Sequence, residues 1–216
     1  MSLHLYMHPL SSYCHKVLIA LYENDTAFEP HTVDLGDPAS RAAFVKIWPI
    51  GKFPVLVDDA RGVTVPESTT IIEYLSHHYP GREPLVPQDE VLARQTRLRD
   101  RFFDLYVHNP MQRIVADRIR PANAKDPHGV EESKSLLRTA YAMIEQDMAN
   151  QPWAMGDRFS MADCAAAPAL FYADKVLPMA ANWPNVAAYL ERIKQRPSYV
   201  RVLAEAAPYF HMFPAG

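Results

Sequence analysis

The chain has 216 residues, of which 49% are hydrophobic and 22% charged, and its formal net charge is −3. A globular protein of this size can bury a core of its own. The weak acidic excess gives no electrostatic reason to expect nucleic acid or an anionic membrane surface as a partner. The two cysteines, Cys14 and Cys164, are too few for a disulfide framework or a cysteine-based zinc site.

No targeting or membrane segment is visible in the sequence. Residues 1–6 lack a basic segment followed by an apolar one, as a secretory signal would have. The longest apolar run, 164–173, contains Pro168 and is much shorter than the roughly 20 residues that cross a bilayer. We therefore expect a cytoplasmic protein that does not bind membranes and whose cysteines stay reduced.

The first 80 residues alternate strand-like and helix-like segments. Apolar residues at every second position predict strands, and apolar residues at helical spacing predict helices. In chain order the predicted elements are a strand over 3–8, a helix over 13–23, a strand over 28–33, a helix over 39–47, a hairpin of 54–57 and 63–65, and a helix that opens at 66–68. This βαβαββα order is what a thioredoxin-like domain shows, although the pattern alone does not separate it from other small α/β sandwiches.

The rest of the chain is predicted to be an all-helical bundle. Three prolines and a glycine in 79–87 indicate a linker. We therefore divide the chain into a domain of residues 1–80, a linker of 81–89 and a helical domain of 90–216. The predicted helices cover 90–118, 129–150, 160–175, 182–196 and 198–206.

Four segments together resemble the cytosolic glutathione transferase superfamily. They are 9–21 (PLSSYCHKVLIAL), 51–57 (GKFPVLV), 66–75 (PESTTIIEYL) and 156–163 (GDRFSMAD). Their order and spacing are those of the family, with one departure at Trp48, where the family usually has Asn before proline. The resemblance is to serine-type members that are bacterial and zeta- or theta-like. It implies a glutathione-binding thioredoxin-like domain followed by a helical domain that shapes a second-substrate pocket.

The implied chemistry needs a thiolate, and a thiol with a pKa of about 8.5 is only slightly ionised at neutral pH. A serine hydroxyl and a helix N-terminus together favour the anion. Serine-type relatives place the acting serine five residues before the basic residue of a Lys/Arg-Val pair, which is Ser11 when counted back from Lys16. Ser12 is the competing candidate, and the structural alternative is that both serines only cap the helix.

Cys14 and Tyr6 are two further candidates near the thiol. Cys14 gives Ser-x-x-Cys where a glutaredoxin has Cys-x-x-Cys, and the helix dipole favours a thiolate in the first turn. Tyr6 lies in the strand where tyrosine-type relatives place their hydroxyl. We expect both side chains to be packing residues, but the sequence leaves open whether Ser11, Ser12 or Cys14 contacts the thiol.

For glutathione, the resemblance implies a binding set of Ser11, Lys52, Phe53, Pro54, Glu67 and Ser68. A cis Phe53–Pro54 bond would turn the Phe53 backbone toward the cysteinyl backbone of the ligand, as an added strand would. Lys52 would approach the glycyl carboxylate. The helix start at Ser68 would bind the γ-glutamyl carboxylate and Glu67 the ammonium. The alternatives are a solvated lysine and an ordinary acidic first turn.

The second-substrate pocket is predicted from apolar side chains, namely Leu10, Tyr106, Met111, Ile114 and Phe210, although such residues in helices are often part of the core. The nine histidines show no metal-ligand spacing. His77 and His78 are adjacent and diverge on a helix, and His4 and His8 lie four apart on a strand. We therefore expect no metal.

These residues predict a glutathione transferase in which the bound thiolate attacks an apolar electrophile, with glutathione as co-substrate. A glutathione-dependent isomerase of the zeta type is one alternative, which activity on maleylacetone distinguishes. A protein of the same fold that binds glutathione without turnover is another. Relatives imply a two-fold homodimer.

Overall fold

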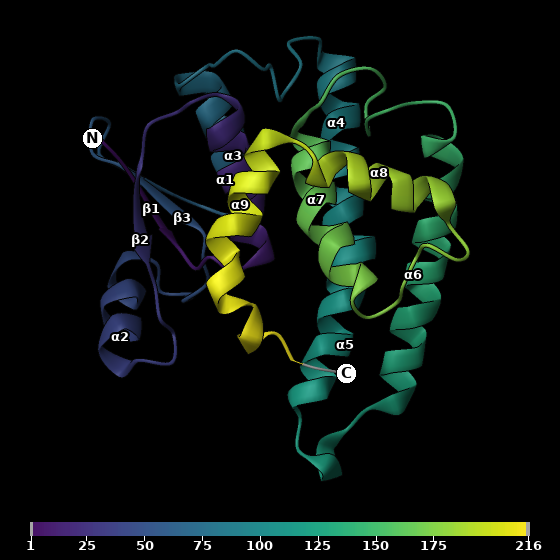
Figure 1. The fold of residues 1–216 in the computed structure, drawn as a ribbon. Helices are drawn as coiled ribbons and strands as arrows, with labels where there is room; N and C mark the ends of the chain where they lie inside the picture. The colour runs from purple at the N-terminus through teal and green to yellow at the C-terminus, as the bar shows by residue number, and fades with distance from the viewer. Residues whose placement is uncertain (1, 215–216) are drawn as a thin grey trace.

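The structure is a computed structural model that describes residues 2–214. Its N-terminal half contains a mixed four-stranded sheet in the order β2-β1-β3-β4 (Figure 1). The strands are β1 (Leu3–Met7), β2 (Glu29–Thr32), β3 (Val55–Asp58) and β4 (Val63–Pro66). β2 runs parallel to β1, whereas β1 and β3, and β3 and β4, are antiparallel pairs. The predicted thioredoxin-like order is confirmed.

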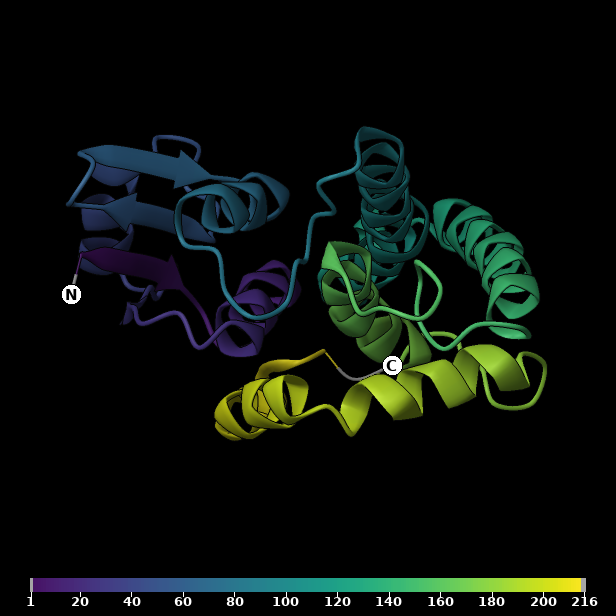
Figure 2. The ribbon, with the colours of Figure 1, turned by 90° about the horizontal axis from the view of Figure 1, so that it is seen from above.

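Different helices cover the two faces of this sheet, because side chains alternate along a strand. The helices are α1 (Ser12–Glu23), α2 (Pro38–Ile47) and α3 (Ser68–His78). Leu3, Leu5 and Met7 are buried in the main core with residues of α1 and α3. Tyr6 points the other way, and its ring stacks on Phe44 of α2 with centroids 6.2 Å apart. α1 and α3 therefore lie between the sheet and the helical half of the molecule (Figure 2).

The second half is helical, as predicted. Its helices are α4 (Glu90–Phe102), α5 (Asn109–Ile119), α6 (Pro127–Met148), α7 (Met161–Asp174), α8 (Pro184–Lys194) and α9 (Pro197–Ala206), with 3₁₀ segments η2 (Ala122–Ala124) and η3 (Ala207–Met212). The single helix predicted over 90–118 is interrupted by a π-helical segment, η1 (Phe103–His108). Among the helices of residues 2–214, none is long and apolar enough to span a bilayer.

The central helix of this half is α7, which packs against α1, α4 and η1. A capping box begins α7, since the Ser160 N–H donates to Asp163 Oδ2 at 2.8 Å. The Asp163 carboxylate also accepts from the Ala154 N–H at 2.8 Å and from the Tyr189 hydroxyl at 2.6 Å. Burial raises the pKa of Asp163, and these donors oppose that shift. One buried carboxylate thus joins α7, α8 and the loop before α7.

The two halves are joined by a buried charge cluster around Lys16 of α1. The Lys16 side chain is only 1% exposed, and its Nζ lies 2.6 Å from Asp100 Oδ1 and 2.9 Å from Asp104 Oδ2. Lys16 Nζ also donates to Thr69 Oγ1 at 2.8 Å, and the Thr69 hydroxyl donates to Asp100 at 2.7 Å. We call Lys16, Thr69, Asp100 and Asp104 the Lys16 cluster. Burial raises the pKa of Asp104, while the Lys16 ammonium opposes that shift.

Replacing Lys16 with Met should destabilise the protein by about 3–5 kcal/mol, because two buried carboxylates lose their cation. Urea unfolding at pH 7, followed by circular dichroism, measures the change. Lys46→Met, at the exposed end of α2, is the matched control and should change stability by less than about 0.5 kcal/mol. Equal effects of the two substitutions would show that the cluster does not hold the halves together.

Candidate functional site

A cavity of about 560 Å³ lies where the end of β1 and the start of α1 meet α5 and the C-terminal segment. Residues of both halves line it: His8, Leu10, Ser11, Ser12, Tyr13, Val33, Asp34, Leu35, Gly36, Gly51, Lys52, Phe53, Met111, Gln112, Val115, Tyr172, Met212, Phe213 and Pro214. The predicted Ser11, Ser12, Lys52 and Phe53 are therefore brought together from separate segments of the sequence. This is the candidate site.

Ser11 and Ser12 occupy the start of α1 in two different ways. Ser11 is the N-cap, and its Oγ accepts from the Cys14 N–H at a long 3.4 Å. Ser12 is the first residue of the helix, and its Oγ lies 2.5 Å from Nε2 of His108. Within residues 2–214 the Ser11 hydroxyl donates to no protein acceptor. Ser11 therefore has a proton to offer to a ligand, whereas Ser12 is held by the helical half.

His108, at the end of η1, is a site residue that sequence reasoning missed. Its ring packs against Tyr13 with centroids 4.3 Å apart, and its Nδ1 is buried without a hydrogen-bond partner in the described residues. Burial, and then the nearby Lys16 ammonium, lowers the pKa of His108 to about 4, so the imidazole is neutral at pH 7. No local sequence signal marks this residue, because it lies 96 positions from Ser12.

Cys14 and Tyr6 do not line the cavity. Cys14 is fully buried beneath the first turn of α1, and burial raises the pKa of its thiol to about 12. A thiol in such surroundings is a poor nucleophile. The Tyr6 ring is stacked between His31, with centroids 4.8 Å apart, and Phe44. Both side chains have the packing environment that we expected for them.

The Phe53–Pro54 peptide bond is cis, as the resemblance implied. Phe53 and Lys52 line the cavity, and Lys52 is exposed. Within residues 2–214, the Phe53 N–H donates to no protein acceptor. An extended peptide lying along this edge therefore has a free backbone donor to pair with.

Glu67 and Ser68 lie at the N-terminus of α3, outside the lining of the cavity. Glu67 is exposed and adopts a φ of 69°, a conformation that side-chain-bearing residues rarely take. Such backbone conformations cluster at ligand sites. Its side chain makes no capping bond, so the first N–H groups of α3 are left without that partner.

The predicted second-substrate residues are not all in one place. Leu10 and Met111 line the cavity, and the Tyr172 hydroxyl fixes the Leu10 carbonyl at 2.7 Å. Ile114 is 4% exposed and lies in the core rather than in the cavity lining. Phe210 packs on Phe171 with centroids 5.7 Å apart and does not line the cavity. Residues 212–214 of the same C-terminal segment line it instead.

Tyr106 also lies elsewhere, in a separate groove of about 920 Å³ between α4 and α6. Tyr106 and Met111 were predicted to line one pocket, but they are five residues apart, with Tyr106 in η1 and Met111 in α5. Five residues exceed one helical turn, so the two side chains project in different directions. We call this second hollow the α4–α6 groove, and its lining residues include Leu92, Leu98 and Met143.

The thioredoxin-like sheet, the cis-proline beside a cavity and the helical half define a two-domain protein of the thioredoxin-like class. Residues 5–83 match the family model of the glutathione S-transferase N-terminal domain, and residues 127–192 that of the C-terminal domain. The chain belongs to the glutathione S-transferase family.

Relatives carry two kinds of name. The chain is 30% identical over 202 residues to a stringent starvation protein A homologue of Pasteurella multocida, covering 91% of this chain and 87% of that protein. It is 31% identical over 164 residues to a glutathione S-transferase-like protein of a Fusarium species, covering 73% and 71%. A crystal structure of a glutathione S-transferase from Methylobacillus flagellatus with glutathione bound is 26% identical, with a TM-score of 0.83 over 93% of this chain and 98% of that one.

The buried histidines should make stability depend on pH. Burial lowers the pKa of both His108 and His15 to about 4, whereas an unfolded histidine titrates near ~6.5. Between these values the unfolded chain binds more protons, so stability falls as the pH is lowered from 6.5 to 4, by about 1.4 kcal/mol per pH unit for each histidine. His108→Gln should remove one of these two contributions.

Urea unfolding at pH 7, 6 and 5 measures this slope for the wild type and for the variant. His128→Gln is the matched control, since the His128 side chain is 86% exposed. The control should keep the slope of the wild type. A His108→Gln slope equal to that of the wild type would mean that His108 is protonated in the native state.

Proposed function

We propose that the protein is a serine-type glutathione transferase of the cytoplasm that conjugates the glutathione thiolate to apolar electrophiles. The observation that carries the proposal is the place of Ser11. Its hydroxyl lies inside the cavity, at the N-terminus of a 12-residue helix, with an uncommitted proton. A hydroxyl donor and a helix N-terminus favour a thiolate over a thiol. Membership of the family supports glutathione as the source of that thiol.

Glutathione would bind along the edge of the sheet that begins at the cis-proline. The Phe53 backbone would pair with its cysteinyl residue, and Lys52 would meet its glycyl carboxylate. The γ-glutamyl carboxylate would accept from the N–H groups at the start of α3 beside Ser68, with Glu67 near the ammonium. The apolar side of the cavity, with Leu10, Met111 and the tail residues, would receive the electrophile.

Ser11 is a better donor to the thiolate than its two neighbours. Ser12 is engaged by His108 at 2.5 Å, and a second strong bond would compete with that contact. Cys14 is buried behind the helix and has a raised pKa, which argues against a mixed-disulfide reaction. Within residues 2–214, the Ser11 hydroxyl takes part only in the long capping bond.

Binding of glutathione without turnover is the second candidate function. It is favoured by the 30% identity to the stringent starvation protein A homologue, whose name does not describe a transferase. Activity separates the two functions, because a binding protein would take up glutathione but convert no electrophile. A zeta-type isomerase is distinguished by turnover of maleylacetone.

Ser11→Ala should separate binding from thiolate formation. In both wild type and variant, glutathione at 100 times its dissociation constant should stabilise the fold by about 2.7 kcal/mol, which a thermal scan detects. In the variant, loss of a hydrogen bond to a charged group, about 1.5–3 kcal/mol, should raise the pKa of the bound thiol by one to two units. Turnover at neutral pH should fall about 10- to 100-fold. The pKa of the bound thiol is measured by following the ultraviolet absorbance of the thiolate as the pH is varied.

Three variants serve as controls for this experiment. Ser12→Ala should lower the stability of the fold, because His108 loses its hydrogen-bond partner, but it should not change the pKa of the bound glutathione thiol. Cys14→Ala and Tyr6→Phe should change neither the pKa nor turnover appreciably. If Cys14→Ala abolishes activity and Ser11→Ala does not, the serine mechanism is wrong. If glutathione caused no shift in the melting temperature of the wild type, the proposal that the protein binds glutathione would be wrong.

We further propose that the protein is a homodimer that buries the α4–α6 groove. Apolar side chains are unusually exposed there, with Leu98 at 68%, Leu92 at 48% and Met143 at 48%. Tyr106 contributes a half-exposed aromatic ring to the same groove. Exposed apolar surface of this kind marks interaction sites, and two-fold self-association is the commonest form of oligomer.

Light scattering at micromolar concentration should return about 49 kDa for the wild type, twice the chain mass of 24.5 kDa. Leu98→Glu should shift the mass toward 24.5 kDa, because a charge is costly to bury in an apolar interface. Ile119→Glu is the control, since Ile119 is 70% exposed at the end of α5, outside the groove. A wild-type mass near 24.5 kDa would contradict the dimer.

A further inference from the structure

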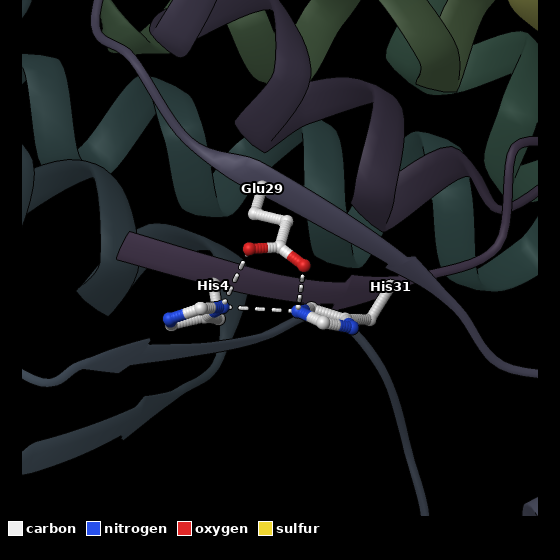
Figure 3. Close-up of side chains that lie close together, drawn as sticks. All are labelled: His4, Glu29 and His31. Carbon is white, nitrogen blue, oxygen red and sulfur yellow. Dashed lines mark hydrogen bonds and ion pairs between the residues drawn. The ribbon is translucent and has the colours of Figure 1, made fainter. Parts of the chain in front are cut away.

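Three metal-ligating side chains meet on the outer face of strands β1 and β2, although no sequence spacing links them. His4 lies on β1, and Glu29 and His31 lie on β2 (Figure 3). In the parallel register, His4 is opposite Glu29, and Tyr6 is opposite His31. Residues two apart on a strand share a face, so all three side chains project to the same side.

The donor atoms of these residues are spaced like the ligands of one small cation. Nδ1 of His4 and Nε2 of His31 are 3.0 Å apart. One oxygen of Glu29 lies 3.5 Å from the His4 nitrogen, and the other lies 3.5 Å from the His31 nitrogen. Tetrahedral ligands bound at about 2.0–2.1 Å are separated from one another by about 3.3–3.4 Å. The three donor atoms lie within 4.8 Å of one another, so a slight separation of the two nitrogens and a rotation of the Glu29 carboxylate bring them onto one ion.

Two further contacts orient the imidazoles. Nε2 of His4 lies 3.0 Å from a carboxylate oxygen of Asp59. With a proton on Nε2 directed to Asp59, the lone pair of His4 is on Nδ1, which faces the other donors. A carboxylate behind a histidine in this way is the usual outer support of a metal ligand. The ring of His31 is stacked on Tyr6 at an interplanar angle of 16°, which limits its rotation.

We propose that His4, Glu29 and His31 form a binding site for one divalent transition-metal ion, with Zn²⁺ as the best fit. Two imidazoles and a carboxylate suit Zn²⁺ far better than Ca²⁺ or Mg²⁺, which prefer oxygen ligands. Three protein ligands leave a fourth position for water or an external group. When the ion binds, the proton between the two facing nitrogens leaves that position and His31 takes the tautomer with its proton on Nδ1, so that both imidazoles bind the ion as neutral ligands.

The ion can reach this site from solvent, because the Glu29 side chain is 51% exposed and the His31 side chain 34% exposed. The carboxylates of Glu29 and Asp59 supply two negative charges to balance it. His4 lies near the first end of β1, whereas the cavity begins at His8, beyond the last residue of the strand. The site is therefore separate from the proposed glutathione site, and its ion would link β1 to β2.

Metal titration tests the proposal with the full chain, free of any histidine tag, of glutathione and of chelator. Calorimetry with Zn²⁺ should show one ion bound per chain, and Co²⁺ should give the visible bands of a tetrahedral complex. His4→Ala and His31→Ala should each weaken binding at least tenfold and remove the Co²⁺ bands. Asp59→Asn, a positioning variant, should weaken binding about 10- to 100-fold while keeping tetrahedral Co²⁺ bands.

His128→Ala is the matched control, because His128 pairs with Glu132 at the same 3.5 Å distance but has no third ligand among the described residues. It should bind Zn²⁺ as the wild type does. Circular dichroism should show that every variant is folded. Absence of equimolar binding in the wild type, or equal binding in His4→Ala and His31→Ala, overturns the proposal. The cluster would then be only a hydrogen-bonded pair of histidines beside a carboxylate.

Discussion

The position of α1 depends on the buried ammonium of Lys16. A lysine that is 1% exposed needs counter-charges, and both of them come from the helical half, Asp100 from α4 and Asp104 from η1. The thioredoxin-like half therefore depends on the helical half to neutralise the Lys16 ammonium of its helix α1. Because Ser11 caps that same helix, the hydroxyl at the candidate site is placed by charges from the other half of the molecule.

The π-helical segment η1 connects this cluster to the site. Asp104 near its start faces Lys16, and His108 at its end reaches Ser12. A π-turn changes the direction of the side chains that follow it and is frequent at functional sites. One short segment thus contacts α1 twice, once through charge and once through a neutral imidazole. Burial lowers the pKa of His108, and the nearby Lys16 ammonium lowers it further.

The sequence predicted much of the fold because its signals are local. Strand alternation, helical spacing and the Ser160–Asp163 box each depend on residues a few positions apart. The candidate site was harder to predict, because its residues come from distant segments. Ser11 and Phe53 were found through the family pattern, whereas His108 has no local signal. Tyr106, Ile114 and Phe210 do not line the cavity, because the apolar character of a residue does not show which surface of the protein it faces.

The histidine cluster on β1 and β2 was missed for a related reason. Its two histidines are 27 residues apart, and only the parallel pairing of the strands brings them together. Sequence spacings that indicate metal ligands apply to ligands on one helix or one loop. On a sheet, the pairing register of neighbouring strands decides which side chains meet. The two-domain architecture likewise fixes the fold but not the reaction, as the mixed names of the relatives illustrate.

The C-terminal segment 212–214, which begins at the last residue of η3, closes one side of the cavity although it lies outside the α-helices of the core. It is held by contacts of two of its residues: the Arg118 side chain donates to the Pro214 carbonyl at 3.1 Å, and the Phe213 ring is stacked on Tyr172. The Ser11 side of the cavity is built from the folding core, whereas this wall is built from the C-terminal tail. Substitutions in the tail can therefore alter which molecules enter at little cost to folding. The lining of this wall can therefore diverge among descendants more freely than the Ser11 side of the cavity, which is tied to the folding core.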